Sequence, residues 1–350
     1  MNELRGILAD TATRLLGTQV TKESVQAAEE GAWPAGLWTA LESNGLTRAL
    51  VPEARGGAGG TWGDAHVLLL AAGRFTAPVP LAETILAGAV LAAAGLDVPD
   101  GTLTVAPVRP GERLALEGAG ATSRLRGVAT RVPWGAAATH AAVVAHAGEV
   151  PHVALVATAS AQVTPGRSLA LEPRDTLEFA GAPVLACTPV ADARVVWRPG
   201  ALVRAVQRAG ALETLLAQSV RYANERVQFG RSVGKFQAVQ QQLAVLAEHV
   251  AAAGMAAAGA CRAAERGDAA FEIAAAKLRA GDAAEVGTAI AHEVHGAIGF
   301  TYEHALHFAT RRLWAWRAEF GDETHWARVL GEGVLARGAD ALWADVTARR

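Results

Sequence analysis

Residues 221–250 read RYANERVQFGRSVGKFQAVQQQLAVLAEHV, and this stretch decides how the C-terminal half of the chain folds. Apolar side chains recur in its second half at steps of three and four residues: Phe236, Val239, Leu243, Leu246 and Val250. That spacing predicts a long amphipathic helix. The turn before this helix carries Arg226 and ends in the pair Phe236–Gln237. The stretch therefore raises the question of what this arginine and this aromatic–amide pair hold.

Length and composition limit the answer. A chain of 350 residues is long enough for two or three domains. With 51% hydrophobic and 19% charged residues, it can bury a sizeable core and is not disordered. A formal net charge of −2 and the lack of a Lys/Arg run argue against nucleic acid as a partner. Cys187 and Cys261 lie in no CxxC or Cys/His pattern, so neither a disulfide framework nor a metal site is expected.

Targeting signals are not evident. The first residues, MNELRGILADTATRLL, predict an amphipathic helix with acidic residues and not a signal peptide. The most apolar stretches are rich in alanine and are broken by glycine or charge, so we expect no membrane span of about 20 residues. The expectation is a soluble, cytoplasmic protein that binds neither membranes nor nucleic acid.

Three zones of different texture divide the chain. Residues 1–100 carry helical patterns, and residues 101–198 carry short apolar runs separated by Gly, Pro and Asp. The runs are TLTVAPV, LALEG, HAAVVAHA, HVALVATA, TLEFAGAPV and ARVVW. Runs of this length predict strands of an antiparallel barrel or sandwich. Residues 199–350 are helical again, with helices expected at about 201–226, 235–266, 268–296, 302–318 and 325–348. The prediction is an α+β fold: an N-terminal helical domain, a middle β-barrel or sandwich domain and a C-terminal four-helix-type bundle.

Three segments, taken in order, resemble motifs of the acyl-CoA dehydrogenase flavoproteins. The opening stretch, YANERVQFGRSVGKFQAVQQQLAVLAEH, is similar to the signature in the first two helices of that family's C-terminal bundle. LVPEARGGAGG (50–60) is similar to its N-terminal glycine loop, and HEVHGAIGFTYEHALHFATRR (292–312) to its C-terminal segment. The resemblance covers nearly the whole chain and implies the family's three-part fold.

The resemblance also implies a reaction. The family uses FAD to oxidise an acyl-CoA thioester to the α,β-enoyl-CoA, with an electron-transfer flavoprotein as the acceptor. A carboxylate removes the α-proton while the β-hydrogen leaves as hydride to the flavin. Such a base has to be close to the substrate, desolvated and raised in pKa, and the flavin supplies the electron sink.

For residues 221–250, the resemblance implies that they bind the FAD of a neighbouring chain. Arg226 matches an arginine that meets the neighbour's FAD pyrophosphate, and a guanidinium suits phosphate oxygens well. Phe229, Phe236 and Gln237 match residues along the ADP half of that cofactor. Gly296 matches a glycine that lets the backbone approach it closely.

The position of the catalytic base departs from the family pattern. In RRLWAWRAEFGDETHWA, the residue that matches the usual glutamate is Phe320, and Glu319 lies one residue earlier. One residue turns a helical side chain by about 100°, so Glu319 is a weak candidate for a displaced base. In a second branch of the family the glutamate position falls near Gly200, and Glu213 lies about three to four turns further along. Both base positions therefore lack a carboxylate.

The flavin-ring contacts also depart from the family pattern. No TEPxAGSD loop is found, and RVPWGAAATHAAVVAHA, with Trp134, is a shortened version of the strand that usually contacts the flavin ring. The residues that follow the base position are altered to Asp322 and Thr324. These departures resemble the smaller, catalytically incomplete subunit of two-gene acyl-CoA dehydrogenases, which often act on steroid side chains or other bulky acyl groups.

Three hypotheses follow from these residues. In the first, the chain is a partner subunit in a hetero-tetramer with a catalytically complete homologous chain, and FAD lies at their interface. In the second, it is a self-sufficient dehydrogenase, for example a homo-oligomer, that uses Glu319 or another carboxylate. In the third, it is a helical scaffold of the same fold without flavin. Nitroalkane oxidation or flavin-dependent hydroxylation on the same fold lacks a supporting residue in the sequence.

Overall fold

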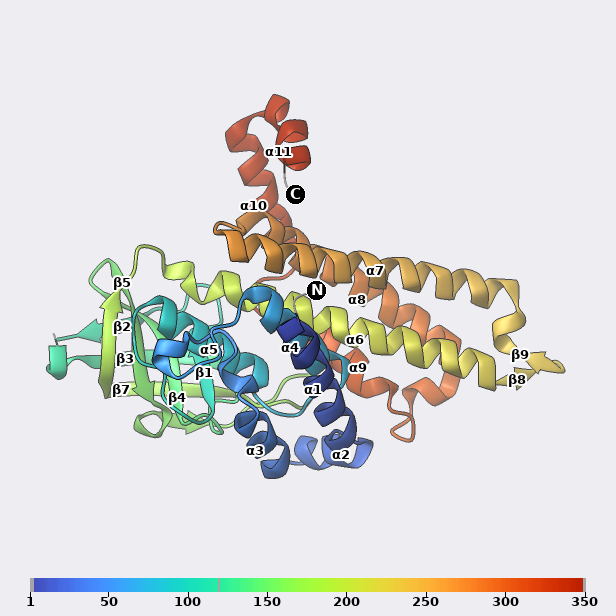
Figure 1. Ribbon diagram of the computed structural model, residues 1–350, viewed down its shortest axis with the longest axis horizontal. Helices are drawn as coiled ribbons and strands as arrows, with labels where there is room; N and C mark the ends of the chain where they lie inside the picture. Colours follow the sequence, from blue (N-terminus) through green and yellow to red (C-terminus); the bar gives the residue numbers. More distant parts are fainter. Residues whose placement is uncertain (1–2, 119, 349–350) are drawn as a thin grey trace.

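The computed structural model describes residues 3–118 and 120–348. Helices, a β sheet and a second set of helices follow one another along the chain. Figure 1 shows the sheet at one end of an elongated molecule and the long helices extending away from it. This order confirms the α+β fold expected from the sequence.

The N-terminal helices are α1 (Glu3–Gln19), α2 (Lys22–Glu29), α3 (Ala35–Ser43), α4 (Trp62–Arg74) and α5 (Leu81–Ala93). A capping box starts α2, where the Thr21 hydroxyl accepts from the Ser24 amide and the Ser24 hydroxyl accepts from the Thr21 amide. The glycine loop before α4 folds back on itself. A Cβ on Gly57 would lie 2.0 Å from the Val51 carbonyl oxygen, so this loop requires glycine.

The strands of the middle part are β1 (Leu103–Ala106), β2 (Leu114–Glu117), β3 (Arg124–Pro133), β4 (His140–Ala147), β5 (Val150–Ala157), β6 (Gln162–Thr164) and β7 (Arg174–Pro189). They form one sheet in the order β1-β4-β2-β3-β7-β5, with β6 on β7. Strand β5 also pairs with β4, so the sheet closes into a ring around its own apolar core. The barrel alternative therefore describes this part better than the sandwich.

Two expectations for the middle part are wrong. The sheet is mixed, because β4 runs parallel to both β1 and β2. The run ARVVW (193–197) is no strand: it forms a 3₁₀ turn (Ala193–Val195) and the start of the next helix. A short apolar run looks the same in a buried strand and at a buried helix start, so its periodicity could not separate the two.

The C-terminal helices are α6 (Trp197–Glu225), α7 (Gln237–Arg266), α8 (Ala270–His295), α9 (Leu306–Arg317), α10 (Glu323–Arg337) and α11 (Leu342–Ala348). A small hairpin, β8 (Val227–Gln228) and β9 (Arg231–Ser232), joins α6 to α7. The expected helices agree with α6 to α9 within a few residues. The single helix expected at 325–348 is divided instead, because Gly338 adopts a φ of +85° after α10.

Helix α7 is long and apolar enough to cross a membrane, which corrects the expectation that no segment reaches this length. Its inner face packs against α6 and α8 in the bundle, with Leu246, Val250 and Ala253 buried. A core helix of a soluble bundle can be equally long and apolar, so length and composition alone are weak evidence for a membrane span. Only 28% of the apolar window is buried, however, so much of its outer face is apolar and exposed.

Helices α4 and α6 cross with their backbones in contact. A Cβ on Gly73 would lie 1.9 Å from the Gln207 carbonyl oxygen, and one on Gly210 would lie 2.0 Å from the Leu70 carbonyl oxygen. No real side chain tolerates such distances, so only glycine permits this crossing. One continuous apolar core joins the N-terminal helices to the C-terminal bundle through it.

Replacing Gly210 by alanine should therefore destabilise the chain. The added methyl group has to push α4 away from α6, which costs about 1–3 kcal/mol for overpacking, or more where backbone must move. Urea unfolding followed by circular dichroism measures this loss. Gly254→Ala is the matched control: Gly254 lies inside α7 with open space around its Cβ position, and this change should stabilise by about 0.5–1 kcal/mol. Equal stability of the two variants would contradict a backbone contact at this crossing.

Candidate cofactor-binding and catalytic sites

Arg226 stands exposed at the end of α6. Its backbone is held on both sides, because its amide donates to the Tyr222 carbonyl and its carbonyl accepts from the Val233 amide, each at 2.8 Å. Its guanidinium has no hydrogen bond or ion pair within the part of the chain that the structure describes. A fixed backbone with a free, exposed guanidinium is suited to an anion outside this chain.

The hairpin after Arg226 presents aromatic rings to the outside. Phe229 is 91% exposed and has a φ of +52°, a left-handed conformation that non-glycine residues rarely adopt. Its ring meets Phe236 edge to face at 6.1 Å, and the Arg231 guanidinium lies 4.1 Å from the centre of the Phe236 ring. Gln237 begins α7 and is exposed beside them. We refer to Arg226 and these four residues as the tip, which leaves much aromatic surface uncovered.

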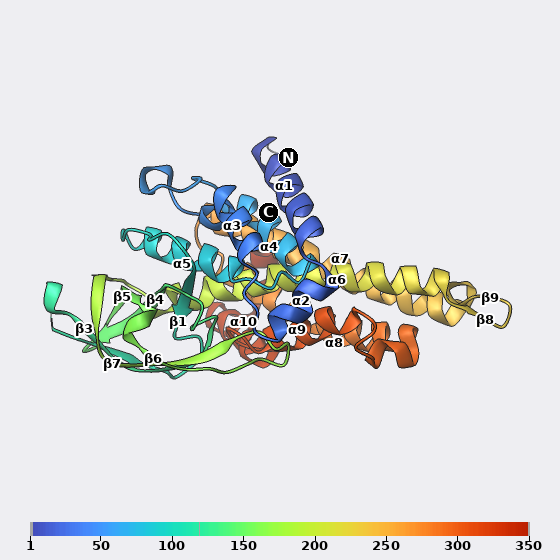
Figure 2. The same ribbon diagram turned by 90° about the horizontal axis from the view of Figure 1, so that it is seen from below.

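Gly296 ends α8 at the same end of the molecule (Figures 1 and 2). It has a φ of +61°, it is exposed, and a Cβ there would meet nothing within 4 Å. The buried ring of His295 stacks on Tyr222 of α6 at 4.6 Å, which packs the end of α8 against the end of α6. Of the residues expected to touch FAD, Arg226, Phe229, Gln237 and Gly296 are thus exposed and Phe236 is half-buried.

The two positions expected for the catalytic base lie together in the interior. Phe320 is 1% exposed, and a Cβ on Gly200 would lie 2.5 Å from its ring. Trp197 packs edge-on against the same ring at 5.9 Å. An aromatic ring and a glycine thus occupy the space where either branch of the family would carry a carboxylate.

The turn that carries Phe320 is held firmly. Lys277 is buried in α8, burial lowers the pKa of its amine, and its Nζ donates to the carbonyls of Arg317 at 2.7 Å and Gly321 at 2.6 Å. The Trp326 indole donates to the Phe320 carbonyl at 2.9 Å. These bonds on both sides support Phe320 in its left-handed conformation, with a φ of +53°.

Glu319 points away from the Phe320 ring into a pair of arginines. One carboxylate oxygen accepts from Arg174 Nε at 2.6 Å, and the other accepts from Arg204 Nε at 2.7 Å. Burial by itself would raise the pKa of Glu319, but the charges of Arg174 and Arg204 outweigh burial and lower the pKa to about 2. A carboxylate so strongly stabilised as an anion is a poor proton acceptor.

These contacts belong to a larger buried ion network. Arg204 also meets Glu83 of α5 at 2.6 Å, and Arg174 meets Glu172 at 3.0 Å. Among the described residues, the network joins carboxylates and guanidiniums in equal number: Glu29, Glu83, Glu172 and Glu319 with Arg174, Arg204, Arg311 and Arg312. Since its members come from the N-terminal helices, the sheet and the bundle, it connects all three parts of the fold.

The remaining candidates have other partners. Glu213 forms an ion pair with Arg74 between α6 and α4. Trp134 is buried in a turn after β3 and packs edge-on against Trp33 at 6.4 Å. Asp322 caps α10 by accepting from the His325 amide at 2.8 Å, and Thr324 is exposed in the first turn of that helix.

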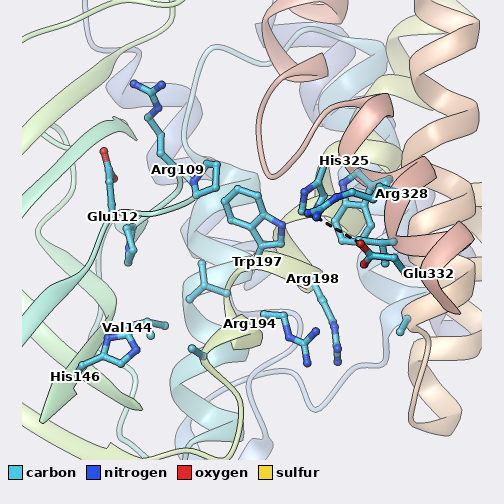
Figure 3. A pocket seen from close by; sticks show the side chains of 17 residues that line it. Arg109, Glu112, Val144, His146, Arg194, Trp197, Arg198, His325, Arg328 and Glu332 are labelled. Carbon is cyan, nitrogen blue, oxygen red and sulfur yellow. Dashed lines mark hydrogen bonds and ion pairs between the residues drawn. The ribbon is translucent and has the colours of Figure 1, made fainter. Parts of the chain in front are cut away.

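A pocket of about 420 Å³ opens between the sheet and the starts of α6 and α10 (Figure 3). Trp197 forms part of its wall, and Phe320 is not among its lining residues. Both carboxylates in the lining are engaged: Glu112 accepts from the Thr130 amide at 3.1 Å, and Glu332 pairs with Arg328 at 3.4 Å. Within the described residues, this pocket therefore offers no free carboxylate for proton abstraction.

Sequence reasoning missed the ion network and the pocket. The partners in the network lie 115 to 283 residues apart, apart from Glu172 and Arg174, so no local spacing connects them. One available signal was charge inside apolar helices, as with Glu83 in LAETILAGAVL and Arg204 in ALVRAVQRAGAL. A charged residue on a buried helical face needs an opposite charge elsewhere in the fold.

Comparisons with known proteins agree with the motifs. Residues 3–97 match the family model "Acyl-CoA dehydrogenase, N-terminal domain", and residues 198–334 match "Acyl-CoA dehydrogenase, C-terminal domain". The chain is 30% identical over 317 residues to "Acyl-CoA dehydrogenase IpdE2" of Mycobacterium tuberculosis, covering 89% of this chain and 91% of that protein.

Two solved structures are similar in both fold and sequence. A chain of the ChsE4–ChsE5 complex from Mycobacterium tuberculosis superposes with a TM-score of 0.89 at 26% identity, covering 97% of this chain and 98% of that one. A chain of the Tcur3481–Tcur3483 steroid ACAD G363A variant superposes with a TM-score of 0.88 at 27% identity, covering 96% and 98%.

Replacing Glu319 by glutamine should destabilise the protein and remove part of its sensitivity to acid. The lowered pKa means that Glu319 contributes stability above its ordinary pKa of 4.5, and this contribution is lost as the pH falls from about 4.5 towards 2. Breaking such a buried pair costs about 3–5 kcal/mol at pH 7. Urea unfolding at pH 7 and in steps down to pH 3 measures both effects. The exposed Glu248→Gln should change stability by less than about 0.5 kcal/mol, and an equal loss there would contradict a special role for Glu319.

Proposed function

Because the chain belongs to the acyl-CoA dehydrogenase family, we propose that it acts as the partner subunit of a hetero-oligomeric, FAD-dependent acyl-CoA dehydrogenase. In this arrangement it completes the FAD site of a catalytically competent homologous chain and does not itself carry the base. The family is one of oxidoreductases that act on CH–CH bonds, and its cofactor is FAD. The ChsE4–ChsE5 and Tcur3481–Tcur3483 structures are assemblies of two different chains, which supports such a pairing.

One contrast carries the proposal. The outward-facing tip keeps Arg226, Phe229 and Gln237 free, whereas Phe320 and Gly200 fill the interior base position with apolar atoms. A self-sufficient enzyme would need a carboxylate at that interior position. A chain that serves a neighbour needs only the tip.

The residues of the tip fit the ADP half of FAD. The free guanidinium of Arg226 suits the pyrophosphate, and the exposed ring of Phe229 suits an apolar or aromatic part of the cofactor. The open space at Gly296 admits the cofactor to the backbone without a side chain in the way. When bound, FAD accepts the hydride from the β-carbon of the acyl group.

The competent chain then supplies the base. Its carboxylate would take the α-proton, the half of the oxidation to the enoyl thioester that complements the hydride transfer which bound FAD would accept. An electron-transfer flavoprotein is the expected acceptor that reoxidises the flavin. The steroid ACAD among the similar structures supports a bulky acyl-CoA as the substrate class.

Arg226→Ala should leave the hetero-oligomer assembled but poor in flavin. The change removes a charge-assisted contact to phosphate, so we expect at least a tenfold loss of FAD affinity. The two chains are co-produced: this chain and a full-length acyl-CoA dehydrogenase chain encoded by a neighbouring gene. The measurement is the flavin absorbance per assembly. Arg14→Ala is the matched control, because Arg14 is exposed on α1, away from the tip. Unchanged flavin content in the Arg226 variant would favour the scaffold hypothesis, and full flavin in the wild-type chain alone would favour the self-sufficient one.

Glu319→Gln should leave the turnover per bound flavin close to wild type, measured with an artificial electron acceptor below the unfolding temperature of the variant. The reason is that both oxygens of Glu319 are engaged by arginines and the side chain points away from Phe320. A loss of turnover by more than a hundredfold at normal flavin content would show that Glu319 is the base and overturn the partner-subunit proposal.

A further inference from the structure

The C-terminal end of the chain forms an arm that stands out from the bundle. We use "arm" for residues 335–348: the last residues of α10, the 3₁₀ turn Ala339–Ala341 and helix α11. Figure 1 shows α10 and α11 rising from one end of α7, away from the rest of the molecule. Within the described part of the chain, the one sizeable packing contact of α11 is with the turn that precedes it.

The arm exposes more apolar surface than a free helix end should. Leu335 is 83% exposed and Trp343 is 78% exposed, and Leu342 and Val346 are each more than 40% exposed. A seven-residue helix such as α11 is too short to be stable in water by itself, because helices below about 12–15 residues are marginal there. Among the described residues, the arm therefore lacks the packing that its helix and its apolar side chains require.

The outer side of α7 continues this uncovered surface. Met255 is 64% exposed and Val245 is 42% exposed, and Ala244 and Ala251 of the same helix are exposed as well. The stretch 251–261 contains no charged residue. Helix α7 starts at the cofactor tip, at Gln237, and its far end leads to the base of the arm, where Asp268 and Leu342 line one small cavity of about 280 Å³. The tip, the outer side of α7 and the arm thus follow one another along the molecule, and we refer to them together as the face; the exposed Arg262, Glu265 and Arg266 lie between Met255 and the arm.

The size of this face indicates why an arm is needed. A 30-residue helix is about 45 Å long and about 10 Å wide, so α7 offers roughly 450 Å² to a flat neighbour. A stable complex buries about 800 Å² per partner. The arm, with a tryptophan that alone covers about 150–250 Å², supplies much of the difference.

We propose that the arm clasps the homologous dehydrogenase chain whose flavin meets the tip, with Trp343 and Leu335 as its anchors. This inference rests on the proposed function, because the tip already requires that chain to lie against the start of α7. Trp is the residue most often found at the energetic centre of interfaces, and here it stands at the open end of the face.

A membrane is the other surface that could cover an apolar helix. For α7 to span a bilayer, it would have to leave the bundle in which Leu246, Val250 and Ala253 are buried. Its outer side also carries the exposed Glu248 and Gln241, whose polar groups would enter the lipid. The face therefore fits a protein partner better than lipid.

The test uses the full-length chain, co-produced with a neighbouring full-length acyl-CoA dehydrogenase chain. Sedimentation velocity and size-exclusion chromatography with light scattering measure assembly for three variants: a stop after Arg337, Trp343→Ser and Leu335→Ser. We expect at least tenfold weaker association for the truncated chain and for Trp343→Ser, with a smaller loss for Leu335→Ser. Leu169→Ser is the matched control, because Leu169 is 62% exposed in a loop before β7, and it should assemble as the wild type does.

Each outcome separates this inference from the proposed function. A flavin-containing hetero-oligomer of normal affinity with the truncated chain would overturn the clasp and leave the proposed function intact. If the arm variants lose self-association when produced alone but still form the hetero-oligomer normally, the arm binds a second copy of this chain. That result would contradict the homologous dehydrogenase chain as the partner of the arm. Arm-dependent flotation with phosphatidylglycerol vesicles would assign it to a membrane. If the full-length chain forms no assembly at all, both the proposed function and this inference fail.

Discussion

Two arginines from different parts of the fold hold the carboxylate of Glu319: Arg174 from the sheet and Arg204 from α6. Burying each of these charges costs several kcal/mol unless its partner is already in place. The contact therefore forms only when the sheet and the bundle meet, and Glu83 of α5 brings in the N-terminal helices through Arg204. This requirement makes the three parts of the chain interdependent, and the position of the turn after α9 follows from it.

The position of that turn determines what fills the interior beside Gly200. Glu319 is directed into the arginines, and Lys277 donates to the turn on both sides of Phe320. The ring of Phe320 packs against Gly200. Any side chain at Gly200 would collide with the ring, so the two residues are matched to each other. The buried charges beside this turn join the sheet, the N-terminal helices and the bundle.

The outer surface shows the opposite condition. Arg226, Phe229 and Trp343 are exposed, and within residues 3–118 and 120–348 little covers their side chains. A protein gains little stability from an exposed ring in a left-handed turn or from a short helix without packing. In the proposed hetero-oligomer, another chain would cover these features.

The sequence by itself determined the order of helices, strands and helices, the long helices of the bundle and the family, because periodicity and motif spacing are local properties of the chain. It also placed Phe320 and Gly200 at the two positions where a base was expected. Only the tertiary structure decided that these positions touch, that Glu319 is an ion-pair partner and that β4 runs parallel to β1 and β2. Those facts depend on contacts between residues far apart in the chain, since most partners in the ion network are separated by more than a hundred positions. No window of the sequence contains both ends of such a contact.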